Sequence, residues 1–270
     1  MRIVSICPSN TELLVYLGLT EQIVGIDNYS DWPASIQHLP KLGPDLDIDI
    51  DQVESLKPDL ILASLSVPGM EKNIERLEER GLPYIILDPQ SLDDIADDLL
   101  KLGQAVQIEA HAKKIVNRYR YILETYRKLG KTINDQPTIY WEWWPRPVFS
   151  PGGVNWLTEM TDIAGGRNLF AEKHTASYKT DWENIVTLDP DYICLIWVGV
   201  SHHKVKKEFV LQRQAARQLK AVRRDQVHIL EEPYFCRPSP RLLIGLKRIA
   251  AILHPEVFPA FTPTDDILEH

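Results

Sequence analysis

Aromatic residues gather in or directly beside segments that are predicted to be loops, where they could line a binding site. A single ring is most often part of a protein core, whereas clustered rings between Pro and Gly suit the walls of a site for a large flat ligand, because rigid rings supply much contact area at little entropic cost. Strand alternation puts Trp141 and Trp143 on one face, which could instead be buried. The residues concerned are Tyr29, Trp32, Trp141, Trp143, Trp144, Phe149, Trp197, Tyr234 and Phe235.

Catalytic and metal-binding signals are weak by comparison. The patterns GxSxG, HExxH and GxGxxG and the P-loop are absent from the chain. His202 and His203 are adjacent, so they cannot face one metal ion from the same side of a helix, and a solvated loop is the commoner interpretation. No general acid–base pair or activated nucleophile stands out. The sequence therefore favours ligand binding without a cofactor over catalysis.

Composition excludes several other classes. The chain has 44% hydrophobic and 25% charged residues, a mean hydropathy of -0.21 and a formal net charge of -8. An acidic total argues against a nucleic-acid-binding protein, which needs a basic face. The three cysteines, Cys7, Cys194 and Cys236, are too few and too widely spaced for a disulfide framework, which predicts reduced thiols.

The ends of the sequence bear on its location. It opens MRIVSICPSN with no signal-peptide or lipobox pattern, which predicts a cytoplasmic protein as written and an extracytoplasmic one if a leader precedes it. No segment approaches the ~20 apolar residues of a membrane helix. The final residues 268–270 are interpreted as the remnant of a purification tag.

The elements that must position these residues alternate between strand and helix. In the first half we predict strands at 2–7, 23–26, 60–63 and 84–87, with a turn at 8–12 before a helix at 13–17 and further helices at 50–56 and 71–80. A helix at 92–102 and a long one from 112 to 129 follow. The second half repeats the plan, with strands at 138–142, 192–198 and 227–230 and helices at 154–164, 182–188, 209–219 and 240–253. This alternation predicts parallel sheets covered by helices.

A short sequence repeat indicates that the chain consists of two similar halves. SLKPDLILAS at 55–64 returns as TLDPDYICLI at 187–196. We therefore predict an α/β protein of two similar lobes with parallel-type sheets flanked by helices, joined by one long backbone helix, with a ligand cleft between the lobes. The expected division is an N-terminal lobe at 1–92, a connecting helical segment at 93–134 and a C-terminal lobe at 135–267.

Loops that follow parallel strands are the expected site, because ligands bind at the carboxyl ends of such strands. These loops carry many of the aromatic residues and several polar side chains. They are predicted at 8–10, 27–32, 64–69, 143–153, 199–204 and 232–239. The predicted ligand-binding residues are Pro8, Ser9, Tyr29, Trp32, Trp143, Trp144, Phe149, Gly152, Trp197, Tyr234, Phe235 and Arg237.

Several motifs together resemble a known family. The segments CPSNTELLVYLGL, VGIDNYSDWP, VESLKPDLILAS, GGRNLF and FCRPSPRLL are similar to those of class III periplasmic binding proteins, in particular the cobalamin-binding member that serves ABC importers. The resemblance runs from Ile3 to about Leu253. It implies two α/β lobes joined by a long helix, with the ligand between them.

The resemblance also implies roles for individual residues. Ligand-contacting positions of the family fall on or near Pro8, Tyr29, Phe149, Gly152, Trp197 and Arg237. A glutamate that docks to the transporter falls on Glu71, and Glu208 is the only acidic residue near the second docking position. The pattern departs from the cobalamin binder at Leu65 and Ile86, where that protein has tryptophans, and at Pro233, where it has an aspartate.

Three functions remain open at this point. The first is a solute-binding protein, expected to be a monomer, that delivers cobalamin or a cobinamide-like corrinoid to an ABC permease dimer. The second is a cytoplasmic relative that binds a corrinoid, haem or ferric siderophore without a transporter. The third is an enzyme of corrinoid processing.

Overall fold

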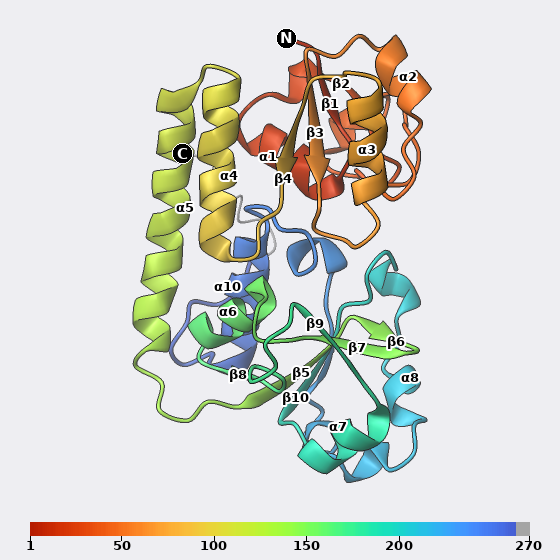
Figure 1. The fold of residues 1–270 in the computed structure, drawn as a ribbon. Coiled ribbons are helices and arrows are strands. Elements are labelled where there is room, and N and C mark those ends of the chain that lie inside the picture. The colour runs from red at the N-terminus through yellow and green to blue at the C-terminus, as the bar shows by residue number, and fades with distance from the viewer. Residues whose placement is uncertain (263–270) are drawn as a thin grey trace. The chain divides into compact units, whose positions relative to one another are not determined.

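The structure, a computed structural model, describes residues 1–262 and divides the chain into two compact units (Figure 1). Of the described residues, the first unit consists of 1–89 and 93–118, and the second of 90–92 and 119–262. The predicted tag at 268–270 lies outside the described residues. The expected α/β class is confirmed in both units.

The first unit is built on a four-stranded parallel sheet. Its strands are β1 (Ile3–Ser5), β2 (Ile23–Ile26), β3 (Leu60–Ser64) and β4 (Tyr84–Leu87), in the order β2-β1-β3-β4. All residues of β1 and β3 are buried, which explains why these strands read as unbroken apolar runs instead of alternating patterns.

Five helices accompany this sheet, and the first one begins earlier than the sequence predicted. They are α1 (Pro8–Tyr16), α2 (Ile50–Ser55), α3 (Glu71–Glu79), α4 (Leu92–Ala105) and the first part of α5 (Glu109–Gly130). The turn predicted at 8–12 is wrong, because α1 already begins at Pro8, after an extended N-cap at Cys7. Proline suits the first helical position, where its missing N–H leaves no helical bond unmade.

The second unit contains another four-stranded parallel sheet. Its strands are β5 (Thr138–Glu142), β8 (Arg167–Asn168), β10 (Tyr192–Leu195) and β11 (Val227–Ile229), in the order β11-β10-β5-β8. Numbered by their appearance in each unit, the strands of both sheets follow the order 2-1-3-4. The two sheets therefore share one topology.

A small antiparallel sheet in the second unit corrects another prediction. Its strands are β6 (Trp144–Pro145), β7 (Val148–Pro151) and β9 (Ser177–Thr180). The segment 143–153 was predicted as a loop, but Trp144 pairs with Phe149 and Val148 pairs with Thr180. The three prolines of this segment conceal the strands from a sequence pattern, since proline is depleted in strands.

The helices of the second unit hold one further correction. They are the rest of α5, then α6 (Trp156–Ile163), α7 (Trp182–Leu188), α8 (Glu208–Leu211), α9 (Lys220–Arg223) and α10 (Leu242–Leu253). The single helix predicted at 209–219 is wrong, because Ala215 adopts a left-handed conformation with a φ of 58° and separates short helical turns. Within residues 1–262, no helix has the length and apolar character required to cross a membrane.

The sequence repeat has the same structural role in both units. Lys57 and Asp189 end a helix in the left-handed region, with φ values of 48° and 44°, and a proline and an aspartate follow each of them. The carboxylate of Asp59 accepts a hydrogen bond from the backbone nitrogen of Arg2 at 2.6 Å, and that of Asp191 accepts one from Thr138 at 3.0 Å. Each aspartate thus ties the third strand of its sheet to the first.

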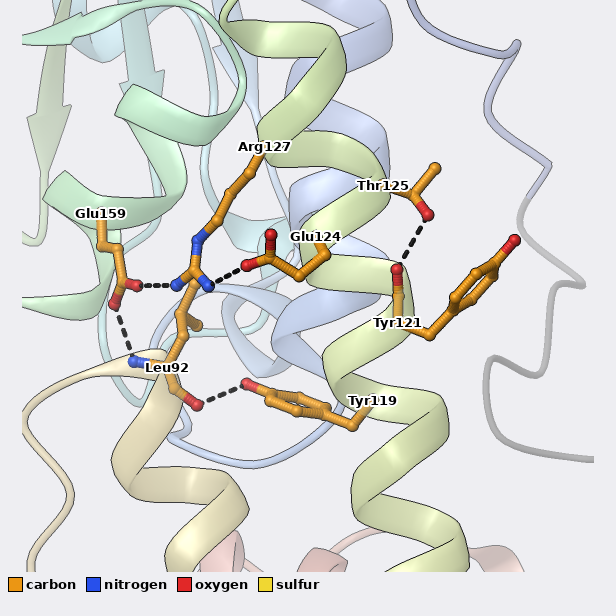
Figure 2. Close-up of polar contacts among 7 residues, drawn as sticks. All are labelled: Leu92, Tyr119, Tyr121, Glu124, Thr125, Arg127 and Glu159. Carbon is orange, nitrogen blue, oxygen red and sulfur yellow. Dashed lines mark hydrogen bonds and ion pairs between the residues drawn. The ribbon is translucent and has the colours of Figure 1, made fainter.

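Leu92, the first residue of α4, belongs to the second unit and takes part in a group of polar contacts there (Figure 2). The backbone nitrogen of Leu92 donates to Glu159 at 2.8 Å, and the hydroxyl of Tyr119 donates to the carbonyl of Leu92 at 3.0 Å. Arg127 pairs with Glu159 at 2.7 Å and with Glu124 at 2.8 Å. A carboxylate therefore satisfies one of the N–H groups that a helix start leaves unpaired.

A buried carboxyl on α4 makes stability depend on pH. Asp98 is 9% exposed, its Oδ2 atom has no hydrogen-bond partner within residues 1–262, and burial raises its pKa to about 7. The folded protein therefore keeps this proton at pH values where the unfolded chain has lost it, so stability falls as the pH rises between about 4 and 7. Lys101 opposes the shift, whereas Asp88, Asp94 and Asp97 add to it.

We expect the substitution Asp98→Asn to stabilise the protein at pH 8 by about 1–2 kcal/mol, after allowance for solvent screening, and to change little at pH 4. Urea unfolding at both pH values measures the difference. An equal effect at both pH values, or destabilisation at pH 8, would contradict the assignment.

Candidate functional site

The carboxyl edge of the first sheet exposes apolar side chains on its loops. Tyr29 is 50% exposed, Leu46 43% and Val67 37%. Tyr29 follows β2 and Val67 follows β3, while Leu46 comes after a segment that runs beside the end of β2, where Asn28 bonds to Gly43. Large exposed apolar side chains that lie at one edge are characteristic of a binding surface.

A buried aspartate holds the loop of Tyr29 in place. Asp27 directly follows β2, is fully buried and accepts hydrogen bonds from the backbone nitrogens of Tyr29 at 2.7 Å and Ser30 at 3.0 Å, and from the hydroxyl of Ser30. Thr11 contacts the hydroxyl of Ser30 at 2.7 Å and donates to Ser5 at 2.8 Å. Burial raises the pKa of Asp27 to about 6. The network links the Tyr29 loop to α1 and β1.

The other residues predicted in the first unit are less accessible. Pro8 and Ser9 form the first turn of α1 and are buried, and the hydroxyl of Ser9 lies 3.3 Å from the sulfur of Cys7. Trp32 is partly buried, with its ring centroid 5.5 Å from that of Tyr16. Among the four predicted residues of this unit, Tyr29 offers the largest exposed side chain.

The carboxyl edge of the second sheet also exposes apolar side chains. Trp144 is 41% exposed, Val198 45% and Phe209 41%. Trp144 comes shortly after β5 and Val198 shortly after β10. Trp197, next to Val198, is partly buried and stacks on Phe209 with ring centroids 5.4 Å apart.

A buried glutamate organises this second edge. Glu142 is the last residue of β5 and is fully buried, and its carboxylate accepts hydrogen bonds from Tyr140 at 2.7 Å, Trp197 at 3.0 Å and both terminal nitrogens of Arg213 at 2.5 and 2.8 Å. Burial, followed by the charge of Glu142, raises the pKa of Tyr140 well above its usual value, so the phenol stays protonated and can donate. The guanidinium of Arg213 lies 4.7 Å from the ring centre of Trp182.

Residues between β5 and α6 differ in their accessibility. Trp143 is partly buried, its indole nitrogen has no hydrogen-bond partner among the described residues, and its ring lies 6.5 Å from that of Trp156. Trp144 and the partly buried Phe149 are paired residues on neighbouring strands. Gly152 is buried, and a Cβ atom there would overlap the carbonyl oxygen of Thr175, so close packing explains this glycine.

The loop after β11 contributes a mixture of core and surface. Phe235 is fully buried, and its ring centroid lies 5.5 Å from that of Trp141, so it is a core side chain in this structure. Tyr234 is partly buried, and its ring centre lies 4.9 Å from the guanidinium of Arg241. Arg237 forms an ion pair with Glu232 at 3.1 Å.

The two residues predicted to dock to a partner are both exposed at helix starts. Glu71 is the first residue of α3, and its carboxylate accepts a hydrogen bond from the backbone nitrogen of Gly69 at 2.7 Å. Glu208 is the first residue of α8.

The thiols and histidines show no features of a reactive or metal site. Burial raises the pKa of Cys7 to about 11 and also raises the pKa values of Cys194 and Cys236, so the thiols stay protonated at neutral pH. His202 and His203 lie in a short 3-10 helix. Residues 1–262 contain no group of three or more His, Cys, Asp or Glu side chains that could hold a metal ion.

Three residues that organise the two edges were not predicted from the sequence. Asp27 was predicted only as the first residue of a candidate site loop, Glu142 as the last residue of a strand, and Phe209 as the first residue of a helix. A carboxylate at the end of an apolar strand was the available signal, because a charge is rarely placed there without a buried partner.

Each of the two α/β units has a parallel sheet whose carboxyl edge exposes aromatic side chains. A family model described as "Periplasmic binding protein" matches residues 3–234. The chain belongs to this family, and it is a binding protein, not an enzyme.

Individual relatives cover most of the chain. It is 29% identical over 262 residues to the uncharacterized ABC transporter substrate-binding lipoprotein YvrC of Bacillus subtilis, covering 95% of this chain and 81% of the relative. It is 27% identical over 249 residues to the vitamin B12-binding protein of Yersinia pestis, covering 92% and 84%. The periplasmic heme-binding protein RhuT of Roseiflexus matches with a TM-score of 0.82 and 21% identity over 94% of this chain and 98% of that one, which shows the fold alone.

Proposed function

We propose that this protein is the substrate-binding component of an ABC importer and binds a corrinoid, either cobalamin or a cobinamide-like molecule. The observation that carries the proposal is the exposure of aromatic and aliphatic side chains on carboxyl-edge loops, with a buried carboxylate that holds the Tyr29 loop in one unit and the indole of Trp197 in the other. Such surfaces suit a large ligand with a flat, partly apolar face. Similarity to a vitamin B12-binding protein supports the corrinoid.

The proposed contacts lie at both edges. In the first unit they are made by the Tyr29 loop, with Trp32 and the start of α1 at Pro8 and Ser9 beside it. In the second unit the exposed ring of Trp144 and the partly buried Trp197 are the main candidates. The remaining candidates, Trp143, Phe149, Gly152, Tyr234, Phe235 and Arg237, contribute through backbone, shape or side-chain contacts.

Delivery to a transporter is the second part of the proposal. Glu71 and Glu208 are exposed carboxylates, and carboxylates form strong two-pronged contacts with arginine side chains of a partner. The names of relatives, which include a substrate-binding lipoprotein, support an extracytoplasmic protein that acts with an ABC permease. We propose that it does so as a monomer.

Haem is the second candidate ligand. Its support is the half-exposed phenol of Tyr29, since tyrosine oxygen can serve as an axial ligand of haem iron. The fold shared with a heme-binding protein is consistent with this alternative.

Spectral titration distinguishes the candidates. The protein is titrated separately with dicyanocobinamide, cyanocobalamin and haemin, and the absorbance is followed at the ligand bands. We expect a saturable change with a corrinoid, and a weaker affinity for the same ligand in the Tyr29→Ala variant because a wall of the site is lost. The matched control is Leu188→Ala, which removes a side chain that is 45% exposed near the start of β10.

Each outcome has a defined meaning. Saturable binding of haemin alone, with a spectral change that Tyr29→Phe abolishes, would replace the corrinoid by haem. Absence of binding for all three ligands would contradict the proposed function.

A further inference from the structure

At the carboxyl edge of the second sheet, two aromatic rings stack on each other, and one of them is exposed. Trp197 and Phe209 lie nearly parallel, with ring centroids 5.4 Å apart and an interplanar angle of 15°. Trp197 is partly buried, whereas Phe209, the second residue of α8, is 41% exposed. Phe209 therefore covers the indole and adds exposed aromatic surface of its own.

The position of this pair is fixed from the buried side. The indole nitrogen of Trp197 donates to Glu142 at 3.0 Å, which restricts the rotation of the indole ring. Glu142 is held in turn by the two-pronged contact with Arg213 and by the hydroxyl of Tyr140. Arg213 is itself packed over the ring of Trp182. A ring fixed before binding loses little entropy when a ligand stacks on it.

The two charged side chains that support the rings neutralise each other. The guanidinium of Arg213 forms an ion pair with Glu142, with side-chain exposures of 17% and 0%. This pair therefore supplies a rigid backing for the stack, and the surface that a ligand meets here is aromatic.

We propose that Phe209 contacts the ligand directly, and that Glu142 and Arg213 are positioning residues that orient the Trp197–Phe209 stack for a ligand with a flat conjugated face. The inference rests on the proposed function and adds a contact residue and its support to it. The class of ligand selected is a tetrapyrrole-like macrocycle, whose conjugated plane can stack on the ring.

Substitutions at Phe209 test the contact. With dicyanocobinamide as the probe, and haemin in parallel, we expect Phe209→Ala to weaken binding about tenfold, the scale of one aromatic contact. Phe209→Tyr keeps a ring of similar shape and should bind within about twofold of the unchanged protein. Leu188→Ala, which removes a similarly exposed apolar side chain from another part of the unit, should leave affinity unchanged.

The positioning role of Glu142 and Arg213 is tested by ligand affinity in variants that remain folded, so that a change in overall stability does not account for the result. Trp197→Phe keeps a six-membered ring but removes the N–H that Glu142 accepts, so we expect weaker binding with an intact far-ultraviolet circular dichroism spectrum. Glu142→Gln keeps an acceptor for the indole but leaves Arg213 without its counter-ion. Its effect on affinity should shrink in the Phe209→Ala background, since both changes act through the same stack.

The outcomes separate this inference from the function itself. Failure of the unchanged protein to bind either probe would overturn the proposed function, and this inference with it. Binding by the unchanged protein with equal affinity for Phe209→Ala would overturn the contact alone. Additive effects of Glu142→Gln and Phe209→Ala would overturn the positioning role, and if Glu142→Gln does not fold, the Trp197→Phe variant decides the question.

Discussion

Replacement of Glu142 by alanine is expected to destabilise the protein by about 3–5 kcal/mol, because it leaves a largely buried guanidinium without its counter-ion. Arg213 donates two hydrogen bonds to this carboxylate, and Tyr140 and Trp197 donate one each. All four donors would lose an acceptor that is itself fully buried. Chemical unfolding followed by circular dichroism measures the loss.

A matched variant at an exposed acidic residue provides the control. Asp51 pairs with Arg80 at 2.6 Å, but its side chain is 79% exposed. Removal of this carboxylate should leave the unfolding midpoint unchanged, because water and salt screen exposed ion pairs. Equal effects of Glu142→Ala and Asp51→Ala would contradict the importance assigned to the buried pair.

The second large effect is expected at Gly245 in α10. A Cβ atom at this position would overlap the carbonyl oxygen of Tyr234 and approach the terminal carbon of Met160 at 3.1 Å. In an open helix, Gly→Ala would stabilise by up to ~1 kcal/mol. Here we expect Gly245→Ala to destabilise by about 1–3 kcal/mol, because the helix and the loop after β11 must separate.

The same change should affect the site. The displaced loop carries Tyr234 and Arg237, so we expect lower ligand affinity even under conditions where the variant is folded. Thermal unfolding and the corrinoid titration measure the two effects. A variant as stable as the unchanged protein, with unaltered affinity, would show that the loop does not depend on this close contact.

Much of the fold could be predicted from local patterns. The strands Ile23–Ile26, Tyr84–Leu87 and Thr138–Glu142 and the helix Trp182–Leu188 coincide with their predicted bounds. Each combines apolar residues with a clear turn or cap, as Asp181 does by accepting a hydrogen bond from Asn184. The repeated aspartate motif also predicted two similar units, and both copies tie the third strand to the first.

The rest depends on contacts that are distant in sequence. Val148 pairs with Thr180 in the antiparallel sheet, although neither segment has the alternating apolar and polar residues that would predict a strand. Arg213 lies 71 positions from the carboxylate that it contacts, and it precedes the left-handed Ala215 in a segment of short turns where a regular helix was predicted. Pairing over such separations is decided by the packing of the whole unit.

The sequence also could not predict which residues of the candidate site are exposed. Sequence position identified the loops that carry aromatic residues, but it could not distinguish Tyr234, which is partly exposed, from its fully buried neighbour Phe235. Phe209 was predicted only as the first residue of a long helix, whereas the short helix α8 places its ring against Trp197 at the carboxyl edge of the second sheet. Exposure of a ring is a property of the folded surroundings.

A crystal structure of the protein with bound cobinamide tests the central claim most directly. We predict that the ligand contacts the Tyr29 loop and the Trp197–Phe209 stack, both at the carboxyl edges of the parallel sheets. A ligand bound at the amino edges, or on the outer faces of the covering helices with both ring groups uncontacted, would contradict the account.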